Sequence, residues 1–110
     1  TIKNLPEDLR NAAFVPGNGD YCLKPQYQTM VSFLRQDIRT ELPDGEFDLI
    51  LCRNLVFTYF DEALQLAVLE RIMTRLRPGG WLLLGVHESL PANTSGLKAE
   101  SERLGLYQYE

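Results

Sequence analysis

The stretch that decides the fold covers residues 46–61 and reads Glu46-Phe47-Asp48-Leu49-Ile50-Leu51-Cys52-Arg53-Asn54-Leu55-Val56-Phe57-Thr58-Tyr59-Phe60-Asp61. Its continuous apolar run, residues 47–52, is typical of a buried strand in a parallel sheet, because helices cover both faces of such a sheet. The run stops at a polar pair, Arg53-Asn54. Since ligands of open α/β sheets bind outside the carboxyl ends of the strands, this pair is the first candidate for a functional site.

A helix and another strand are expected after this stretch. Asp61 suits the N-cap of a helix, and apolar residues then recur at spacings of three and four up to Leu76. Pro78-Gly79-Gly80 is expected to end the helix, and residues 81–86 form the next apolar run. The order strand, helix, strand predicts a right-handed βαβ unit with two parallel strands. The sequence therefore predicts an α/β fold with a doubly wound sheet.

The rest of the chain gives weaker signals. The sequence predicts a helix start within residues 1–12, a loop at 14–20, a short extended piece at 21–24, a helical turn at 25–28, a turn at 42–45 and a final strand at 104–109. Residues 31–36 are expected to form a further strand that ends at Asp37-Ile38. Residues 97–102 fit no single type of element.

Composition narrows the classes of function. With 110 residues the chain suits one small domain, and its formal net charge of -4 does not favour a nucleic-acid partner. The arginines of the predicted helix, Arg71, Arg75 and Arg77, are offset by Glu70 and are expected to form a solvated face. No apolar stretch approaches the roughly 20 residues of a membrane span. We therefore expect neither a nucleic-acid partner nor a membrane span.

The N-terminus and the cysteines indicate the cellular compartment that is expected for the protein. The N-terminus lacks the apolar core of a signal peptide. Two cysteines, Cys22 and Cys52, are too few for a disulfide framework or a metal quartet, and Cys52 is expected to pack in the core. A reduced, cytoplasmic protein without a metal site is expected. Because the chain starts without methionine, a fragment of a longer protein is one reading.

Four motifs resemble the chemotaxis receptor methyltransferases (CheR type). They are Phe47-Asp48-Leu49-Ile50-Leu51-Cys52-Arg53-Asn54, Tyr59-Phe60-Asp61, Leu76-Arg77-Pro78-Gly79-Gly80-Trp81-Leu82-Leu83-Leu84-Gly85 and Glu88-Ser89-Leu90. The resemblance extends to residues 31–33, 37–39 and 106–109, and so covers nearly the whole chain. Enzymes of this family use S-adenosylmethionine to methylate glutamate side chains of chemoreceptors. The resemblance implies an S-adenosylmethionine-dependent protein-glutamate O-methyltransferase with a protein substrate.

The resemblance also implies a set of cofactor contacts. Asp37 and Ile38 match a pair beside the adenine ring, where a carboxylate accepts a hydrogen bond from the amino group and an aliphatic side chain covers the ring. Asn54 and Leu55 match contacts near the methionine part of the cofactor. A polar strand end that only leads into a turn is the alternative for each pair.

Two further residues are candidates for catalysis. Tyr59 matches a tyrosine that lines the active site near the transferred methyl group, although core packing explains it equally well. Arg53 can orient a carboxylate by charge-assisted hydrogen bonds, or it can be a structural residue at the strand end. Methyl transfer to an anionic oxygen needs little acid–base help, so proximity and orientation are expected to dominate.

The chain departs from the family pattern in two ways. Four residues separate Asn54 from Tyr59, where the family has three. The glycine-rich loop after a first strand, the acidic residue that ends a second strand and the family's N-terminal helical domain have no counterpart here. The fold class that follows is the C-terminal portion of a Rossmann-like class I methyltransferase sheet, lacking its first two strands, with residues 1–110 as one partial domain.

Three consequences are expected if the first two strands and the glycine-rich loop have no counterpart in this chain. The strand at residues 31–36 has no neighbour in the chain, so an upstream segment or a partner chain, such as a second copy in a homo-oligomer, is expected to complete the sheet. The chain alone is expected to bind the cofactor weakly or not at all. The alternative functions are a non-catalytic interaction module derived from this fold and a methyltransferase for another substrate.

The strand end at residues 87–89 leaves smaller questions open. Glu88 and Ser89 either shape the mouth of the crevice or simply end the strand. His87 is expected on the surface, and Trp81 in the core or at a domain contact.

Overall fold

The structure is a computed structural model, and it describes residues 2–17 and 19–110. The chain divides into two compact units, Thr1–Arg35 and Gln36–Glu110. The expectation that residues 1–110 form one partial domain stays a prediction.

The first unit contains short helices and a small hairpin. Its elements are the 3-10 helix η1 (Ile2–Asn4), α1 (Glu7–Ala13), β1 (Phe14–Pro16), β2 (Tyr21–Leu23) and α2 (Pro25–Gln28). The helix start, the extended piece and the helical turn expected in this region are confirmed. The loop expected at 14–20 is wrong at its beginning, because β1 pairs antiparallel with β2 and joins Phe14 to Leu23. This pairing satisfies backbone groups that a loop would leave to water.

The second unit is a mixed α/β structure. Its elements are β3 (Phe47–Leu51), α3 (Val56–Tyr59), α4 (Glu62–Arg75), β4 (Leu76–Leu83), β5 (Leu97–Ser101) and β6 (Leu106–Tyr109). The four strands lie in the order β3-β4-β6-β5. β3 and β4 are parallel, whereas β6 runs antiparallel to both β4 and β5. The predicted strand–helix–strand unit with parallel strands and the final strand are therefore confirmed.

Helix α4 begins where the sequence predicts. The side chain of Asp61 accepts a hydrogen bond from the backbone N–H of Leu64 at 2.9 Å, as an N-cap residue does. The end of the helix differs from the prediction, because β4 starts at Leu76 directly after Arg75. The expected turn at Pro78-Gly79-Gly80 lies inside β4, where the pairing with β3 shifts register. Gly79, at a φ of +82°, provides the left-handed backbone that this irregular pairing uses.

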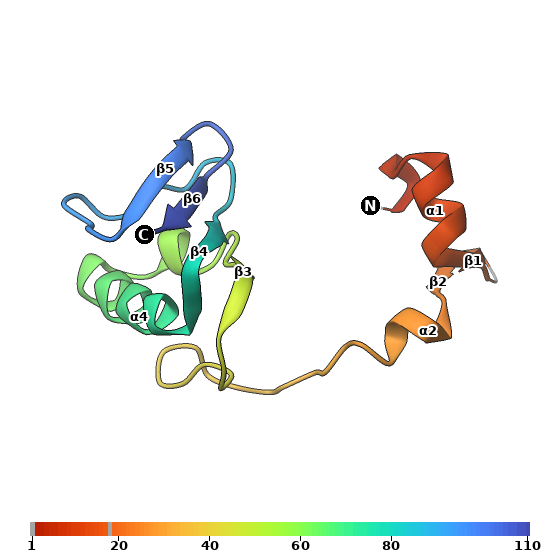
Figure 1. Ribbon diagram of the computed structural model, residues 1–110, viewed down its shortest axis with the longest axis horizontal. Coiled ribbons are helices and arrows are strands. Elements are labelled where there is room, and N and C mark those ends of the chain that lie inside the picture. The colour runs from red at the N-terminus through yellow and green to blue at the C-terminus, as the bar shows by residue number, and fades with distance from the viewer. Residues whose placement is uncertain (1, 18) are drawn as a thin grey trace. The chain divides into compact units, whose positions relative to one another are not determined.

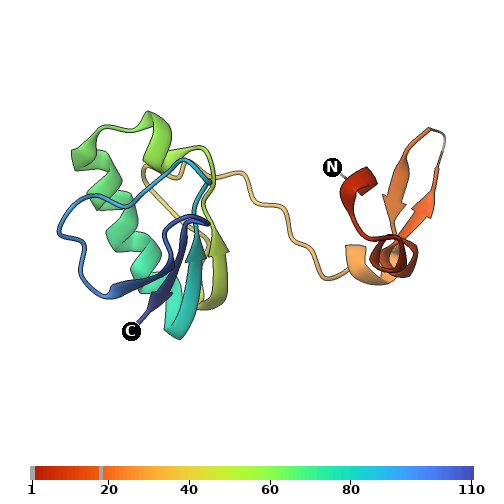
Figure 2. The ribbon, with the colours of Figure 1, turned by 90° about the horizontal axis from the view of Figure 1, so that it is seen from above.

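The core lies between α4 and one face of the sheet. Val68 and Ile72 of α4 and Leu82 of β4 are all buried. Figure 2 shows α4 on one side of the strands. The opposite face of β3 carries Leu49 and Leu51, which are 52% and 61% exposed. The expectation that helices cover both faces is therefore wrong within residues 36–110, where no helix lies over this second face.

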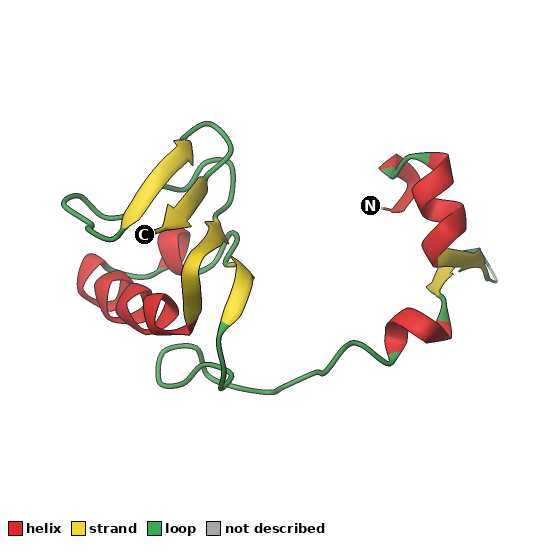
Figure 3. Ribbon diagram, in the orientation of Figure 1, coloured by secondary structure: helices red, strands yellow, loops and turns green. Residues whose placement is uncertain are grey.

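The strand expected at residues 31–36 is absent from the part of the chain that the structure describes. This segment is an extended loop (Figure 3), and the side chain of Phe33 is 94% exposed. An apolar segment becomes a strand only when a neighbour takes up its backbone hydrogen bonds, and residues 2–17 and 19–110 supply none here. The two missing strands expected beside it stay a prediction.

Among the helices that the structure describes, none is long and apolar enough to cross a membrane.

Candidate functional site

The carboxyl ends of β3 and β4 meet around the side chain of Glu88, which is only 6% exposed. Oxygen Oε1 of Glu88 accepts hydrogen bonds from the backbone N–H groups of Asn54 at 2.8 Å and Gly85 at 2.6 Å. Oxygen Oε2 accepts a hydrogen bond from the hydroxyl of Thr58 at 2.7 Å. One carboxylate therefore joins the ends of two parallel strands to the short helix α3.

These contacts keep Glu88 ionised. Burial raises the pKa of its carboxyl group, but the hydrogen bonds from the Thr58 hydroxyl and from the N–H groups of Asn54, Gly85 and Leu55 outweigh burial and lower the pKa below 4.5. A depressed folded-state pKa contributes stability above the unfolded-state value. That contribution is lost as the pH falls from about 4.5 through the folded-state pKa.

Asn54 has an unusual backbone conformation. Its φ of 58° lies in the left-handed region, which asparagine tolerates better than most residues. Its side chain lies against Gly85, where a Cβ atom would come within 2.2 Å of Asn54 Oδ1. A side chain at position 85 would therefore displace the side chain of Asn54.

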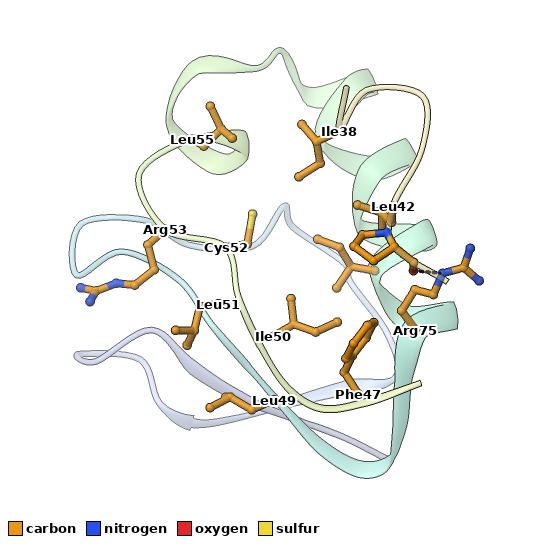
Figure 4. Close-up of a pocket in the computed structure, with 12 residues that line it drawn as sticks. Ile38, Leu42, Phe47, Leu49, Ile50, Leu51, Cys52, Arg53, Leu55 and Arg75 are labelled. Carbon is orange, nitrogen blue, oxygen red and sulfur yellow. Dashed lines mark hydrogen bonds between the residues drawn. The ribbon is translucent and has the colours of Figure 1, made fainter. Parts of the chain in front are cut away.

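An apolar pocket of about 450 Å³ opens beside this junction (Figure 4). Ile38 and Leu55 face each other above Cys52 in the view of Figure 4. The guanidinium of Arg53 also belongs to the lining but points away from the apolar side chains. The other lining residues are Leu42, Pro43, Phe47, Leu49, Ile50, Leu51, Ile72 and Arg75.

Two arginines of α4 form hydrogen bonds with the loop that carries Ile38. Arg71 donates a hydrogen bond from Nη1 to the carbonyl oxygen of Arg39, and Arg75 donates one from Nε to the carbonyl oxygen of Pro43 at 2.9 Å. Arg71 is exposed, as expected for a solvated helix face, whereas Arg75 is half-buried, and both arginines also bind this loop. The sequence does not reveal this role, because the acceptors are main-chain carbonyls far away in the chain.

Asp37 already has a charged partner. Its carboxylate accepts hydrogen bonds from Nε and Nη2 of Arg39, at 3.0 and 2.7 Å, and from the backbone N–H of the same residue at 3.0 Å. The side-chain hydrogen bond from Arg39 is the main reason that the pKa of Asp37 falls to about 2. The carboxylate stays ionised and keeps lone pairs for a further donor.

Replacing Arg39 by glutamine is expected to raise the pKa of Asp37 from about 2 towards its ordinary value of 3.8, because the charged partner is lost. Carboxyl ¹³C shifts followed by NMR between pH 7 and 1 measure this midpoint. Arg77→Gln is the matched control, since Arg77 pairs with Asp48 instead, and it should leave Asp37 unchanged. A midpoint that stays near 2 in Arg39→Gln would show that the ion pair does not set this pKa.

The structure brings some of the sequence candidates together. Ile38, Arg53 and Leu55 share the pocket lining, and Asn54 stands next to them at the Glu88 junction. Asp37 and Tyr59 are not among the described residues that line the pocket, and Tyr59 is 76% exposed at the end of α3.

The prediction for Cys52 in this region has a clear outcome, whereas Glu88 was not assigned a role. Cys52 is buried as expected, and burial raises the pKa of its thiol. The sequence left the role of Glu88 undecided. The available signal was a charged residue just after the apolar run at residues 81–86.

Comparison with known proteins gives a consistent result. Residues 1–105 match the family model described as "CheR methyltransferase, SAM binding domain". The chain is 34% identical over 89 residues to a chemotaxis protein methyltransferase of Listeria monocytogenes, a match that covers 81% of this chain and 34% of that protein.

Two further relatives agree with this match. A chemotaxis protein methyltransferase of Vibrio parahaemolyticus is 37% identical over 90 residues, covering 81% of this chain and 32% of that protein. Chemotaxis protein methyltransferase 1 of Pseudomonas aeruginosa is 35% identical over 86 residues, covering 77% and 31%. The chain thus spans about a third of the length of these curated relatives.

Proposed function

Since this chain belongs to the CheR methyltransferase family, in its SAM-binding domain, we propose that it is the C-terminal part of the cofactor-binding domain of an S-adenosylmethionine-dependent methyltransferase. The proposed substrate is a glutamate side chain of a protein, of the chemoreceptor type that the names of the relatives suggest. The observation that carries the proposal is the convergence of Ile38, Arg53 and Leu55 on one pocket beside Asn54, at the carboxyl end of β3.

The residues present fit such a cofactor in polarity. Ile38 and Leu55 give an apolar wall that suits an aromatic base, and the ionised carboxylate of Asp37 lies next to Ile38 in the chain and suits an amino group. The side chain of Asn54 offers a donor and an acceptor for the polar methionine end. S-adenosylmethionine supplies an activated methyl group when bound. The role of these residues is to bind and orient, which is where most of the rate enhancement of such a transfer arises.

Arg53 and Tyr59 are proposed to act on the substrate side. The guanidinium of Arg53 is exposed at the pocket rim and points away from the apolar wall, so it is free to pair with a substrate carboxylate. Tyr59 presents an exposed ring at the end of α3, five positions after Asn54. We propose that it borders the space in which the methyl group moves.

Titration of S-adenosylhomocysteine into the ¹⁵N-labelled chain tests this function. Shifts of the amide signals are expected at Ile38, Asn54 and Leu55, with a weak affinity on the order of millimolar, because the sequence contains only part of a cofactor site. Amide NMR spectra measure the shifts and the affinity together.

A matched pair of variants makes this titration specific. Asn54 and Asn93 are both asparagines with positive φ, at 58° and 64°. Asn54→Gly preserves the left-handed backbone and removes the side chain, so it should abolish the response, whereas Asn93→Gly should preserve it. No response in the unmodified chain would contradict the millimolar affinity expected here, and an equal response in Asn54→Gly would contradict the proposed role of Asn54. Tight binding would contradict the expectation that the glycine-rich loop is essential.

A second candidate function is a non-catalytic interaction module. The observation that favours it is the exposed apolar face of β3, with Leu49 and Leu51, on a strand with one neighbour among the described residues. Unpaired edges of this kind invite another chain to add a strand. A second copy or another segment of a longer protein is the proposed occupant. This reading predicts no response to S-adenosylhomocysteine, so the same titration separates it from the enzyme.

A further inference from the structure

We propose that Glu88 is a positioning residue, whose carboxylate holds the main chain of Asn54 and the helix α3 in the arrangement that presents Asn54-Leu55 to the cofactor. The inference rests on the proposed function. It adds a residue that is remote in sequence from the other candidates and lies after β4 rather than β3.

The first argument is the conformation of Asn54. Its φ of 58° lies in the left-handed region, which asparagine tolerates better than most residues, so a contact to its main chain can select this conformation. The backbone N–H of Asn54 donates to Glu88 Oε1 at 2.8 Å, across 34 positions of sequence. Because this hydrogen bond acts on the main chain of Asn54 itself, it restrains the direction of the Asn54 side chain just after β3.

The second argument is that the same carboxylate joins three elements. Oε1 also accepts the N–H of Gly85 at 2.6 Å, and Oε2 accepts the hydroxyl of Thr58, on α3, at 2.7 Å. A Cβ at position 85 would approach Glu88 Oε1 to 2.7 Å, so the carboxylate fills the space beside the glycine. Backbone pairing, including the hydrogen bond from Cys52 N–H to Leu83 O at 3.0 Å, already joins the strands, and the Glu88 carboxylate links the residues after them to α3.

The third argument is that these contacts need the ionised form. The groups that hydrogen-bond to Glu88 are all donors in the structure, and a carboxylate is an acceptor only, whereas a protonated carboxyl would direct one O–H at a donor. The titratable neighbour is Cys52, at the end of β3, whose pKa is raised by burial and by the charge of Glu88. Cys52 therefore stays neutral where Glu88 titrates. Thr58 of α3 contributes an uncharged hydroxyl, and Gly85, after β4, contributes a backbone amide.

A pH titration of the ¹⁵N-labelled chain tests the positioning role without any cofactor. The amide signals of Asn54 and Gly85 are expected to shift together, with one midpoint below the ordinary glutamate pKa of 4.5. Glu88→Gln should abolish this midpoint. Glu100→Gln, at an exposed glutamate of β5, is the matched control and should preserve it. Separate midpoints, or a shared midpoint that survives Glu88→Gln, would overturn the proposal.

The conservative variant distinguishes positioning from a general need for a folded core. The amide oxygen of Glu88→Gln can still accept an N–H, so this variant should retain part of the response to S-adenosylhomocysteine. Glu88→Ala should bind about tenfold more weakly, which corresponds to a fall of the arrangement that presents Asn54-Leu55 to about a tenth of the molecules. Equal affinities in the chain and in both variants would overturn the role. If Glu88→Ala does not fold, Thr58→Val removes a single donor and should weaken binding in the same direction.

The cofactor titration tests the proposed function, and the pH titration tests the positioning role of Glu88 separately. If the unmodified chain gives no response to S-adenosylhomocysteine, the proposed function fails, while the shared titration of Asn54 and Gly85 still decides whether Glu88 holds the strand ends. If the chain does respond but Asn54 and Gly85 do not titrate together, the function stands and the positioning role is overturned.

Discussion

Replacing Leu82 by alanine is expected to lower the free energy of unfolding of the second unit by about 3 kcal/mol. Leu82 has no exposed surface, and it is paired with Ile50 on β3 and with Tyr107 on β6. Truncation removes apolar contacts and leaves a cavity that a strand with neighbours on both sides cannot close. Since small domains are stable by only about 5–15 kcal/mol, this loss is a large fraction of the total. Urea denaturation followed by circular dichroism measures it.

Leu51→Ala is the matched control for this prediction. It makes the same chemical change on the adjacent strand, but Leu51 is 61% exposed on the uncovered face. The expected loss is therefore about 0.5 kcal/mol, as for most surface substitutions. If both variants lost the same free energy, the core would not lie on the α4 side of the sheet.

Replacing Gly85 by alanine is expected to lower the free energy of unfolding by about 1–3 kcal/mol, because the new methyl group displaces the side chains of Asn54 and Glu88. Its Cβ would lie 2.2 Å from Asn54 Oδ1 and 2.7 Å from Glu88 Oε1. To make room, the Asn54 side chain must rotate or the Glu88 carboxylate must leave its donors. Chemical denaturation gives the loss, and the amide shift of Asn54 reports the displacement.

A double variant checks the cause. Asn54→Gly removes the nearer of the two clashing atoms and still allows a positive φ. If the steric account is correct, Gly85→Ala costs less in the Asn54→Gly background than in the unmodified chain, since contacting residues are not additive. Strict additivity would show that the Gly85→Ala effect comes from elsewhere.

Much of the fold could be predicted where the local pattern and the tertiary contacts agree. Helix α4 has a capping aspartate and a regular apolar stripe, and β3 and β6 lie close to their expected positions. Prediction failed where a backbone partner decides the structure. Residues 14–16 became a strand because β2 lies beside them, and residues 31–36 did not because no described neighbour takes up their hydrogen bonds.

The residues of the candidate site also differ in whether the sequence could predict their roles. Asn54 was identifiable from a polar pair that follows an apolar run, and family membership supports the cofactor. The sequence did not predict that Arg71 and Arg75 hold the loop of Ile38. Their acceptors are main-chain carbonyl oxygens, which every residue type carries. No residue pattern therefore identifies them.

The sequence by itself determined the α/β class, the parallel pairing across the helix, the family and the position of Asn54 at a strand end. These features depend on periodicity, capping and motifs, which are local along the chain. Only the tertiary structure decided that Glu88 fixes the main chain of Asn54 from 34 positions away, and that one face of β3 is exposed. Both depend on which elements come to lie next to each other. A buried carboxylate takes its role from the donors that folding brings to it.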